Sequence, residues 1–444
     1  MVVLCDHPAA FSSIKKMKGG LKMGKLKKND LVEKKITRRE FIKNTARATA
    51  TAATIGTIGF PTVLRAATPS EISIGHIHPL SGFLAFDGQE MRKAVMWGVQ
   101  EVNDAGGIKS LGGAKLKLID ADSEGKPEKA ISEVERLERE GVVAMTGCYQ
   151  SAVTIVATQI AEKLKVPFVV GVASAEAITK RGFQYTFRVQ PSSSIFVRRG
   201  LGYMQQLSEK TNTKLETIAY IHENTQFGQT LADFTEKLAG EYGFKVTKRV
   251  EYSVKAPDVS TEVGKIKAAK ADLIFASGYF GDGVRVARAL SNMRVKAKAI
   301  VGIAQGGFSH PKFVKELDNE ITKGIMDVNF QFDPNSAKAK KTLAGFEAKY
   351  GTKMSPSMVY AYSPVPVIAD AIERAGSADR AAIRAALVKT HFTEHILPQG
   401  PIEFSDEGQN INANPLLMQV LNGKVEVVWP EKYKTGDIVF PFNK

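Results

Sequence analysis

The chain has 444 residues and a formal net charge of +15; 43% of its residues are hydrophobic and 24% are charged. This composition is typical of a globular protein and excludes general disorder, collagen and a polytopic membrane protein. Residues 1–67 contain 14 Lys and Arg against four acidic residues, which leaves 47 basic and 42 acidic residues in the remaining 377. Because the excess positive charge lies mostly at the N-terminus, no nucleic-acid partner is expected for the body of the protein.

The N-terminal region has the order of an export signal: a basic segment, a weakly apolar segment over 48–64, and small residues. The apolar segment is too short to span a bilayer, which takes about 20 residues. Residues 37–43, which include Arg38, Arg39 and Phe41, resemble the twin-arginine signature. That resemblance implies passage of the folded protein through the twin-arginine export machinery. Cleavage is expected near Ala66 or Ala67, so that residues 1–67 form a leader and the mature protein is free in the periplasm.

Cysteine is rare, with Cys5 in the leader and Cys148 in the body. A mature protein with a single thiol has no internal disulfide, and the low cysteine content excludes disulfide scaffolds and Cys-rich zinc sites.

After residue 70, short β-branched runs alternate with amphipathic helical patterns. The first series predicts strands at 72–77, 115–120, 142–146 and 166–172, separated by helices at 89–103, 127–138 and 151–164. The second series predicts strands at 217–221, 245–252, 273–277 and 299–303, with helices at 229–242, 260–267, 283–293 and 310–317. Three more helices are expected at 337–350, 365–374 and 378–389, followed by a hairpin over 414–428 around Asn422-Gly423. The fold class is therefore α/β, with two doubly wound parallel-sheet lobes and a cleft between them.

Several short motifs of enzyme chemistry are absent from the sequence, including GxxxxGK[ST], HExxH and GxSxG. His391 and His395 have metal-clip spacing, but no acidic or thiol cluster accompanies them, so a surface pair is favoured. Asp120 and Asp122 at a strand end are interpreted as loop and helix caps rather than an acid–base pair. No catalytic residue, metal or cofactor is expected.

Five fragments in a specific order resemble the branched-chain amino-acid family of periplasmic solute-binding proteins, which have the type I fold. They are residues 79–82, 101–108, 120–122, 181–188 and 222–228. The resemblance implies three crossovers, which form a three-strand hinge. It divides the chain into lobe 1 at 70–188 plus 324–400 and lobe 2 at 189–323 plus 401–444.

Ligands of open parallel sheets bind beyond the carboxyl ends of the strands. Residues 147–151, including Tyr149, follow a strand and open a helix. Free N–H groups and the helix dipole there favour an anion, and Ser151 adds a hydroxyl donor. Ser151 is alternatively an ordinary helix cap. In the family, the matching serine holds the ligand's carboxylate.

The resemblance also implies ligand contacts at the next strand end, Ala173 and Ser174, although Ser174 equally suits a helix start. Phe227 and Tyr279 match aromatic positions that close over the ligand, the alternative being core packing. Asp87, or its neighbour Phe86, matches a further cleft position, the alternative being a helix cap.

One departure from the family concerns the loop after the strand at 299–303. Amino-acid-binding members usually place an acidic residue there, whereas this chain has Gln305 within Ala-Gln-Gly-Gly. Because an unpaired buried ammonium costs several kcal/mol, either Asp87 replaces that acid or the ligand is a carboxylate without an amine.

The function expected is that of the binding component of an ABC importer, a monomer that captures a small carboxylate-bearing solute by lobe closure and docks on a membrane permease. Branched-chain amino acids and related aliphatic or aromatic acids are the candidate solutes. A ligand-sensing protein of a regulator or receptor system is the alternative, and a secreted enzyme is a weaker one.

Overall fold

The computed structural model describes residues 69–442. The twin-arginine block with Arg38, Arg39 and Phe41 and the expected cleavage point at Ala66 or Ala67 lie outside the described residues. Within residues 69–442, none of the helices combines the length and apolar character needed to cross a membrane.

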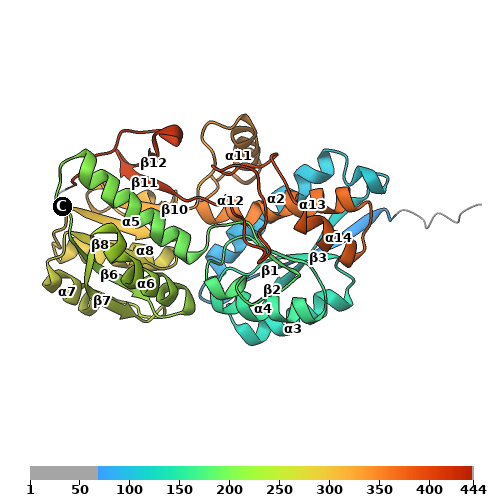
Figure 1. The fold of residues 1–444 in the computed structure, drawn as a ribbon, viewed down its shortest axis with the longest axis horizontal. Coiled ribbons are helices and arrows are strands. Elements are labelled where there is room, and N and C mark those ends of the chain that lie inside the picture. Colours follow the sequence, from blue (N-terminus) through green and yellow to red (C-terminus); the bar gives the residue numbers. More distant parts are fainter. Residues whose placement is uncertain (1–68, 443–444) are drawn as a thin grey trace, which may run out of the picture. The chain divides into compact units, whose positions relative to one another are not determined.

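The first sheet is entirely parallel, with the strand order β2-β1-β3-β4-β5. Its strands are β1 (Glu71–His78), β2 (Lys115–Asp122), β3 (Ala144–Gly147), β4 (Phe168–Val170) and β5 (Thr186–Arg188). The helices between these strands are α2 (Ala85–Asp104), α3 (Pro127–Arg139) and α4 (Ser151–Lys163), and Figure 1 shows them on both faces of the sheet. Helices α11 (Ala337–Tyr350), α12 (Pro356–Tyr362), α13 (Pro364–Ala375) and α14 (Arg380–Val388) follow later in the chain, and α12 and α13 pack against α2.

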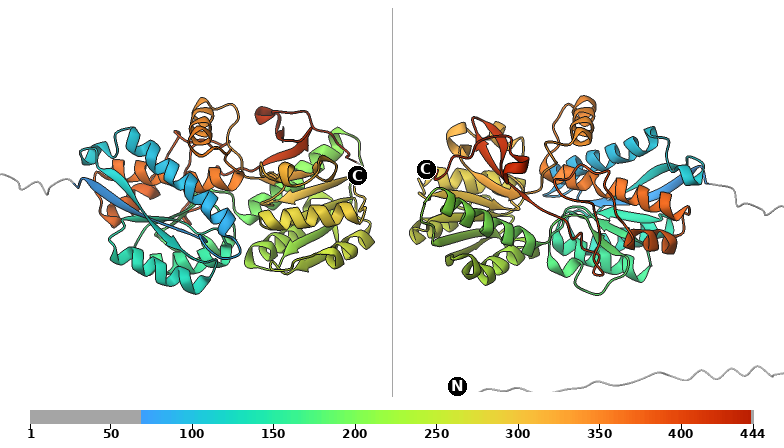
Figure 2. Two further views of the ribbon diagram at one scale, coloured as in Figure 1. Left: turned by 180° about the vertical axis from the view of Figure 1, so that it is seen from behind. Right: turned by 45° about the horizontal axis from the view of Figure 1, so that its top comes forward.

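The second sheet has the order β12-β11-β10-β9-β8-β6-β7, with β11 antiparallel to both of its neighbours. Its strands are β6 (Thr217–Glu223), β7 (Lys245–Tyr252), β8 (Leu273–Ser277), β9 (Ala299–Ile303), β10 (Met326–Asn329), β11 (Leu416–Leu421) and β12 (Lys424–Trp429). The accompanying helices are α5 (Ser193–Lys210), α6 (Gln226–Leu238), α7 (Ser260–Ala269), α8 (Phe280–Asn292), α9 (Phe313–Glu316) and α10 (Asn319–Thr322). Figure 2 shows the C-terminal hairpin β11–β12, in red, which forms one edge of this sheet.

The first sheet is buried on both faces, as its alternating helices require. Ile72 and Ile74 of β1 belong to the cluster beneath α2, whereas Ile77 packs in the cluster beneath α3 and α4. This arrangement directs the carboxyl ends of the strands toward a common edge, where their loops lie.

Within residues 69–442 the chain passes between the two sheets three times: after β5, after β10 and before β11. Arg188, fully buried at the end of β5, organises the first and third passages. Its guanidinium donates to the Ala175 carbonyl at 2.7 Å, the Thr179 hydroxyl at 3.2 Å and the Gln409 side chain at 2.7 Å. The main chain of Asn410 donates to the Arg188 carbonyl at 2.9 Å, so β5 and the returning segment are bonded to each other at the hinge.

The prediction of two doubly wound, parallel-rich sheets is confirmed. The boundary expected at residue 324 precedes β10, which pairs with β9 and β11, so the second sheet extends to Asn329. The helix expected over 310–317 is only the single turn α9. Helices α5 and α12 and strands β5 and β10 were not predicted. Gly200 and Gly202 lower the helix propensity of α5 in its middle, and Pro356 and Pro364 confine α12 to seven residues.

Candidate functional site

Loops from the carboxyl ends of both sheets meet at a small cavity. Its walls come from β-strand ends and helix starts of both lobes: Tyr149, Val172, Ala173, Phe227, Gly278, Tyr279, Ala304, Gly306, Asn329, Phe330 and Ser357. The cavity is partly open to solvent, and its volume of about 20 Å³ has room for about one water molecule.

Aromatic rings from the two lobes contact one another at this cavity. Tyr149, after β3, contacts Tyr279, after β8, edge-on with 5.1 Å between ring centroids. Phe227 of α6 lies 5.6 Å from Tyr279. The rings of the two lobes are therefore in contact, and the cavity between them is too small for a molecule the size of an amino acid.

The turn from β3 into α4 is unusually tight. Gly147 has φ +116°, and a Cβ atom there would lie 2.1 Å from the Ile77 carbonyl oxygen. Cys148, also left-handed at φ +52°, donates its N–H to the same carbonyl at 2.5 Å. Since a side chain is strained in this conformation, Gly147 is needed for the turn that aims the start of α4 at the cavity.

The N-terminus of α4 has no side-chain cap among the described residues. Its first N–H groups therefore keep their partial positive charge and their capacity to donate. Ser151, the first residue of α4, accepts the N–H of Ala175 at 3.3 Å through its hydroxyl oxygen, which leaves the hydroxyl hydrogen to donate. An anion is thus favoured at this helix end.

The helices of the second lobe that start beside the cavity are capped by buried carboxylates. Glu223 accepts N–H groups of Thr225 and Gly228, the latter at 2.6 Å, at the start of α6. Asp282 accepts the N–H of Tyr279 at 2.8 Å at the start of α8 and pairs with Arg285. Burial raises the pKa of Glu223 to about 7 and that of Asp282 to about 6.

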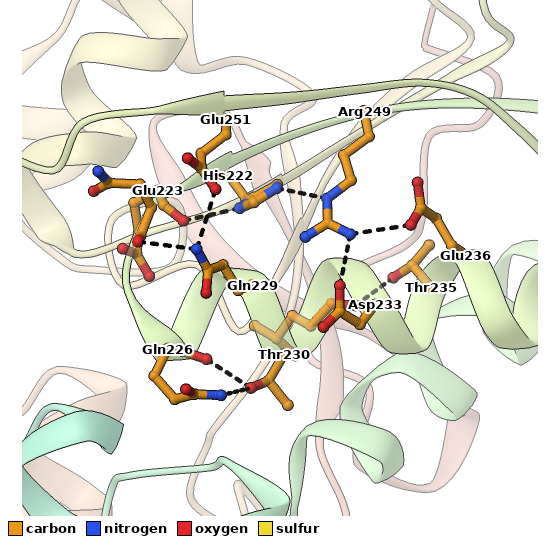
Figure 3. A network of polar contacts seen from close by, with 12 residues as sticks. His222, Glu223, Gln226, Gln229, Thr230, Asp233, Thr235, Glu236, Arg249 and Glu251 are labelled. Atoms are coloured by element: carbon orange, nitrogen blue, oxygen red, sulfur yellow. Dashed lines mark hydrogen bonds and ion pairs between the residues drawn. The ribbon is translucent and has the colours of Figure 1, made fainter. Parts of the chain in front are cut away.

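A polar network joins strands β6 and β7 to helix α6 (Figure 3). Neutral His222 contacts the Glu223 carbonyl through Nδ1 at 2.8 Å, and Arg249 donates to its Nε2 at 2.9 Å. Arg249 in turn pairs with Asp233 of α6 at 2.6 Å. Burial lowers the pKa of His222, which agrees with an imidazole that accepts from a guanidinium.

Asp87 lies in the first turn of α2, at the lobe 1 side of the cavity. Its Oδ1 is 3.4 Å from the hydroxyl of Tyr149. Loss of solvation between the lobes raises the pKa of Asp87 to about 7, and the charges of Glu90 and Asp282 add to the rise.

A second set of contacts joins the lobes beside the cavity. Glu90 of α2 pairs with His310 at 3.3 Å and Lys312 at 3.1 Å, both from the segment after β9. The Lys312 ammonium also lies 4.1 Å from the ring of Phe86, which packs on Phe280 of the other lobe at 5.1 Å. Although burial opposes it, His310 and Lys312 hold the pKa of Glu90 below its usual range. These contacts thus link α2 to the segment after β9 and to α8 both by charge and by ring packing.

The structure brings four of the sequence-predicted residues to the cavity wall: Tyr149, Ala173, Phe227 and Tyr279. Ser151 is the first residue of α4, two residues after Tyr149, and Asp87 adjoins the wall through its contact with the Tyr149 hydroxyl.

Ser174 and Gln305, like Ser151 and Asp87, are not part of the cavity wall. The Ser174 hydroxyl turns to Ser193 at 3.1 Å, in the hinge. Gln305 is fully buried in the second lobe, where its Oε1 accepts the N–H of Gly307 at 2.5 Å. In both cases a nearby protein partner competes with the cavity for the polar group.

Sequence reasoning did not name several residues of the wall. Four of these residues lie at carboxyl ends of predicted strands, where ligand contacts are expected, so the sequence could have identified them: Val172, Gly278, Ala304 and Gly306. Asn329, Phe330 and Ser357 belong to or adjoin β10 and α12, which were not predicted. Across residues 69–442, no group of three or more His, Cys, Asp or Glu side chains is arranged to hold a metal ion.

Comparison with known proteins gives a consistent result. A family model described as "Periplasmic binding protein" matches residues 71–424. The Leu/Ile/Val-binding protein homolog 7 of Brucella suis is 28% identical over 394 residues, covering 85% of this chain and 97% of that protein. Homolog 8 of Brucella abortus is 27% identical, covering 85% and 95%.

Solved structures share the fold. The branched-chain amino acid transporter substrate-binding protein LivJ of Streptococcus pneumoniae, in complex with isoleucine, superposes with a TM-score of 0.70 at 26% identity, covering 81% of this chain and all of that one. A leucine-binding protein of Thermotoga maritima gives a TM-score of 0.69 at 22% identity, covering 81% and 98%.

Proposed function

The chain belongs to the periplasmic binding protein family, and we propose on this premise that it is the solute-binding component of an ABC importer. The family is one of binding proteins, so the expectation of a non-enzymatic protein is confirmed. The proposed solute is a small carboxylate-bearing molecule, a branched-chain amino acid or a related aliphatic or aromatic acid. The names of the relatives, which include Leu/Ile/Val-binding homologues and an isoleucine complex, support this class.

The observation that carries the proposal is the free N-terminus of α4 beside an interlobe cavity. The solute's carboxylate accepts from the first N–H groups of α4 and from the Ser151 hydroxyl, while Ala173 offers its main chain. A helix N-terminus contributes about 0.3–1 kcal/mol to an exposed anion and up to ~2 kcal/mol when the anion is partly buried. Phe227 and Tyr279 of the second lobe cover the bound solute and exclude water.

Binding then proceeds by closure of two lobes. We assign residues 70–188 and about 330–400 to lobe 1 and residues 189–329 and 401–444 to lobe 2, since β10 pairs in the second sheet. The solute shifts the open–closed balance by its difference in affinity for the two forms. The closed form, a monomer, docks on the membrane permease.

The proposed route to the periplasm is the twin-arginine pathway, on the strength of Arg38, Arg39 and Phe41 in the leader. Replacing both arginines by Lys should leave the precursor in the cytoplasm, which cell fractionation measures. Continued export through the general secretory route would contradict this assignment.

The proposed function is tested by a thermal-shift screen of branched-chain amino acids and of aliphatic and aromatic carboxylates. A ligand at 100 times its Kd adds about 2.7 kcal/mol to the free energy of unfolding. With the best ligand, Ser151→Ala should weaken binding by about 1–3 kcal/mol, the cost of an unmade buried hydrogen bond. Ser132→Ala, at an exposed position of α3, is the matched control. Unchanged calorimetric affinity in Ser151→Ala would remove Ser151 from the site.

A further inference from the structure

The carboxylates around the cavity-lining loops differ in how fully the protein satisfies them. Four of them are each held by at least two protein donors: Glu90, Glu223, Asp282 and Asp327. Asp87 has one side-chain partner, the Tyr149 hydroxyl at the long distance of 3.4 Å. No cation of the described residues lies within ion-pair distance of Asp87. Of these five carboxylates, Asp87 is therefore the one whose oxygens are most available to accept hydrogen bonds from a solute.

The position of Asp87 complements the anion subsite. The main chain of Tyr149 immediately precedes the first turn of α4, and its hydroxyl donates to Asp87. The Tyr149 side chain thus spans the interval from the positive helix end to Asp87. A solute lying along this ring has a hydrogen-bond donor and partial positive charge at one end and a carboxylate at the other.

The second lobe offers no competing site for a cation at the loop after β9. Gln305 is fully buried and its Oε1 already accepts from Gly307. Glu223 and Asp282 are committed to the starts of α6 and α8. A buried ammonium without a partner is unfavourable by several kcal/mol, so an amine on the solute needs a carboxylate such as Asp87.

From this arrangement we propose that Asp87 is a specificity-determining residue that binds the amino group of the solute, so that the protein selects amino acids over the corresponding acids without an amine. This inference rests on the proposed function, because it assigns the second charged end of the same solute. A purely structural role for Asp87, as an acidic residue in the first turn of α2, would not distinguish between the two kinds of solute.

Isothermal calorimetry with matched pairs of solutes tests the inference. Each pair differs only in the amine: leucine and isocaproate, phenylalanine and hydrocinnamate, γ-aminobutyrate and butyrate. The wild-type protein should bind the amino member of the best pair at least tenfold more tightly. Asp87→Asn should lose at least tenfold in affinity for that member and keep or improve its affinity for the partner acid. Asp87→Glu, which keeps the charge, should retain the preference for the amine.

Glu90→Gln is the control, because it weakens a contact between the lobes without facing the solute's amine, and it should change both members of a pair by the same factor. Equal losses for both members in Asp87→Asn would overturn the specificity role, as would a wild-type protein that binds the amine-free acid equally well. If the wild-type protein binds no carboxylate of the screen, the proposed function itself fails. A thermal denaturation midpoint of Asp87→Asn close to that of the wild type shows that the variant is folded.

Discussion

Both lobes place strand–loop–helix units at the cavity, but they differ in whether a side chain caps the helix N-terminus. In the second lobe, Glu223 and Asp282 use their carboxylates to satisfy the starts of α6 and α8. In the first lobe, the start of α4 has no side-chain cap, although it lies beside the same cavity. Because a capped helix end has its charge and donors already matched, the difference supports the proposal that the first lobe binds the carboxylate of the solute. The carboxylates of the second lobe that border the cavity are already bonded to N–H groups of their own helices, which is compatible with the proposed binding of one more carboxylate at α4.

The largest effect is expected from the turn that aims α4. In Gly147→Ala the new Cβ would meet the Ile77 carbonyl oxygen, so the free energy of unfolding should fall by about 3–5 kcal/mol, as for other substitutions at strained backbone positions. Gly141→Ala is the control, because Gly141 also has a positive φ but has no atom within 4 Å of the built Cβ. It should cost only about 1 kcal/mol in urea unfolding. Equal losses in the two variants would show that the turn tolerates a side chain.

A substitution that gives α4 a carboxylate cap, like those of α6 and α8, should abolish this difference between the lobes. Ser151→Asp places a carboxylate on the first N–H groups of α4, where it competes with the solute's carboxylate and repels it. Affinity for the best solute should fall at least 100-fold, about 2.7 kcal/mol, as measured by calorimetry. Ser132→Asp adds the same charge on exposed α3 and should leave affinity unchanged. An affinity of Ser151→Asp within threefold of the wild type would contradict the assignment of the anion to α4.

The caps of the second lobe can be tested by pH. The pKa of Glu223 is raised from 4.5 to about 7 in the folded protein, so the folded state holds this proton more tightly than the unfolded state does. Ionisation therefore removes stability as pH rises from about 5 to about 7, whereas Glu223→Gln has no such loss. The stability advantage of the wild type over the variant should shrink by about 2 kcal/mol between pH 5 and pH 8, at ~1.4 kcal/mol per pKa unit. A difference in urea unfolding that is constant over this range would refute the prediction.

The smallest effect is expected where the lobes touch outside the cavity. Glu90→Gln weakens the pairing with His310 and Lys312, which favours closure for every solute alike. We expect a uniform loss of about fivefold, near 1 kcal/mol, and a larger radius of gyration by X-ray scattering at subsaturating solute. A loss confined to one class of solute would instead place Glu90 in the recognition site.

Much of the fold could be predicted from the sequence, because alternation and helical spacing are local signals. Strands β7, β8 and β9 and helix α11 have the predicted bounds. Strand β10 was missed because its sequence Met-Asp-Val-Asn contains two polar residues. In the structure these are buried and form hydrogen bonds with Ser309, with Gln305 and with each other. Ser309 and Gln305 lie 18 and 24 residues away from their partners in the chain, so these hydrogen bonds leave no local sequence pattern.

The loops that form the candidate site could be predicted from the sequence, but the directions of their side chains could not. Topology selected the strand ends that carry Tyr149, Ala173 and Tyr279. It could not show that Ser174 turns to Ser193, or that Gln305 turns into its own lobe to meet Gly307. Each choice depends on which partner is nearer in three dimensions, and that is settled by the packing of the whole lobe.

The bonding of Arg188 at the hinge limits how the molecule can move. Its guanidinium holds β5, the segment around Ala175 and the returning strand at Gln409 as a single block, and burial that lowers its pKa to about 10 still leaves it charged at neutral pH. If the lobes move as proposed, we expect the bending to lie beyond this block. Because two of the three connections are bonded to each other at Arg188, we expect these two to move together. In the proposed closure, this coupling would restrict how Tyr149 and Tyr279 are brought into contact across the cavity.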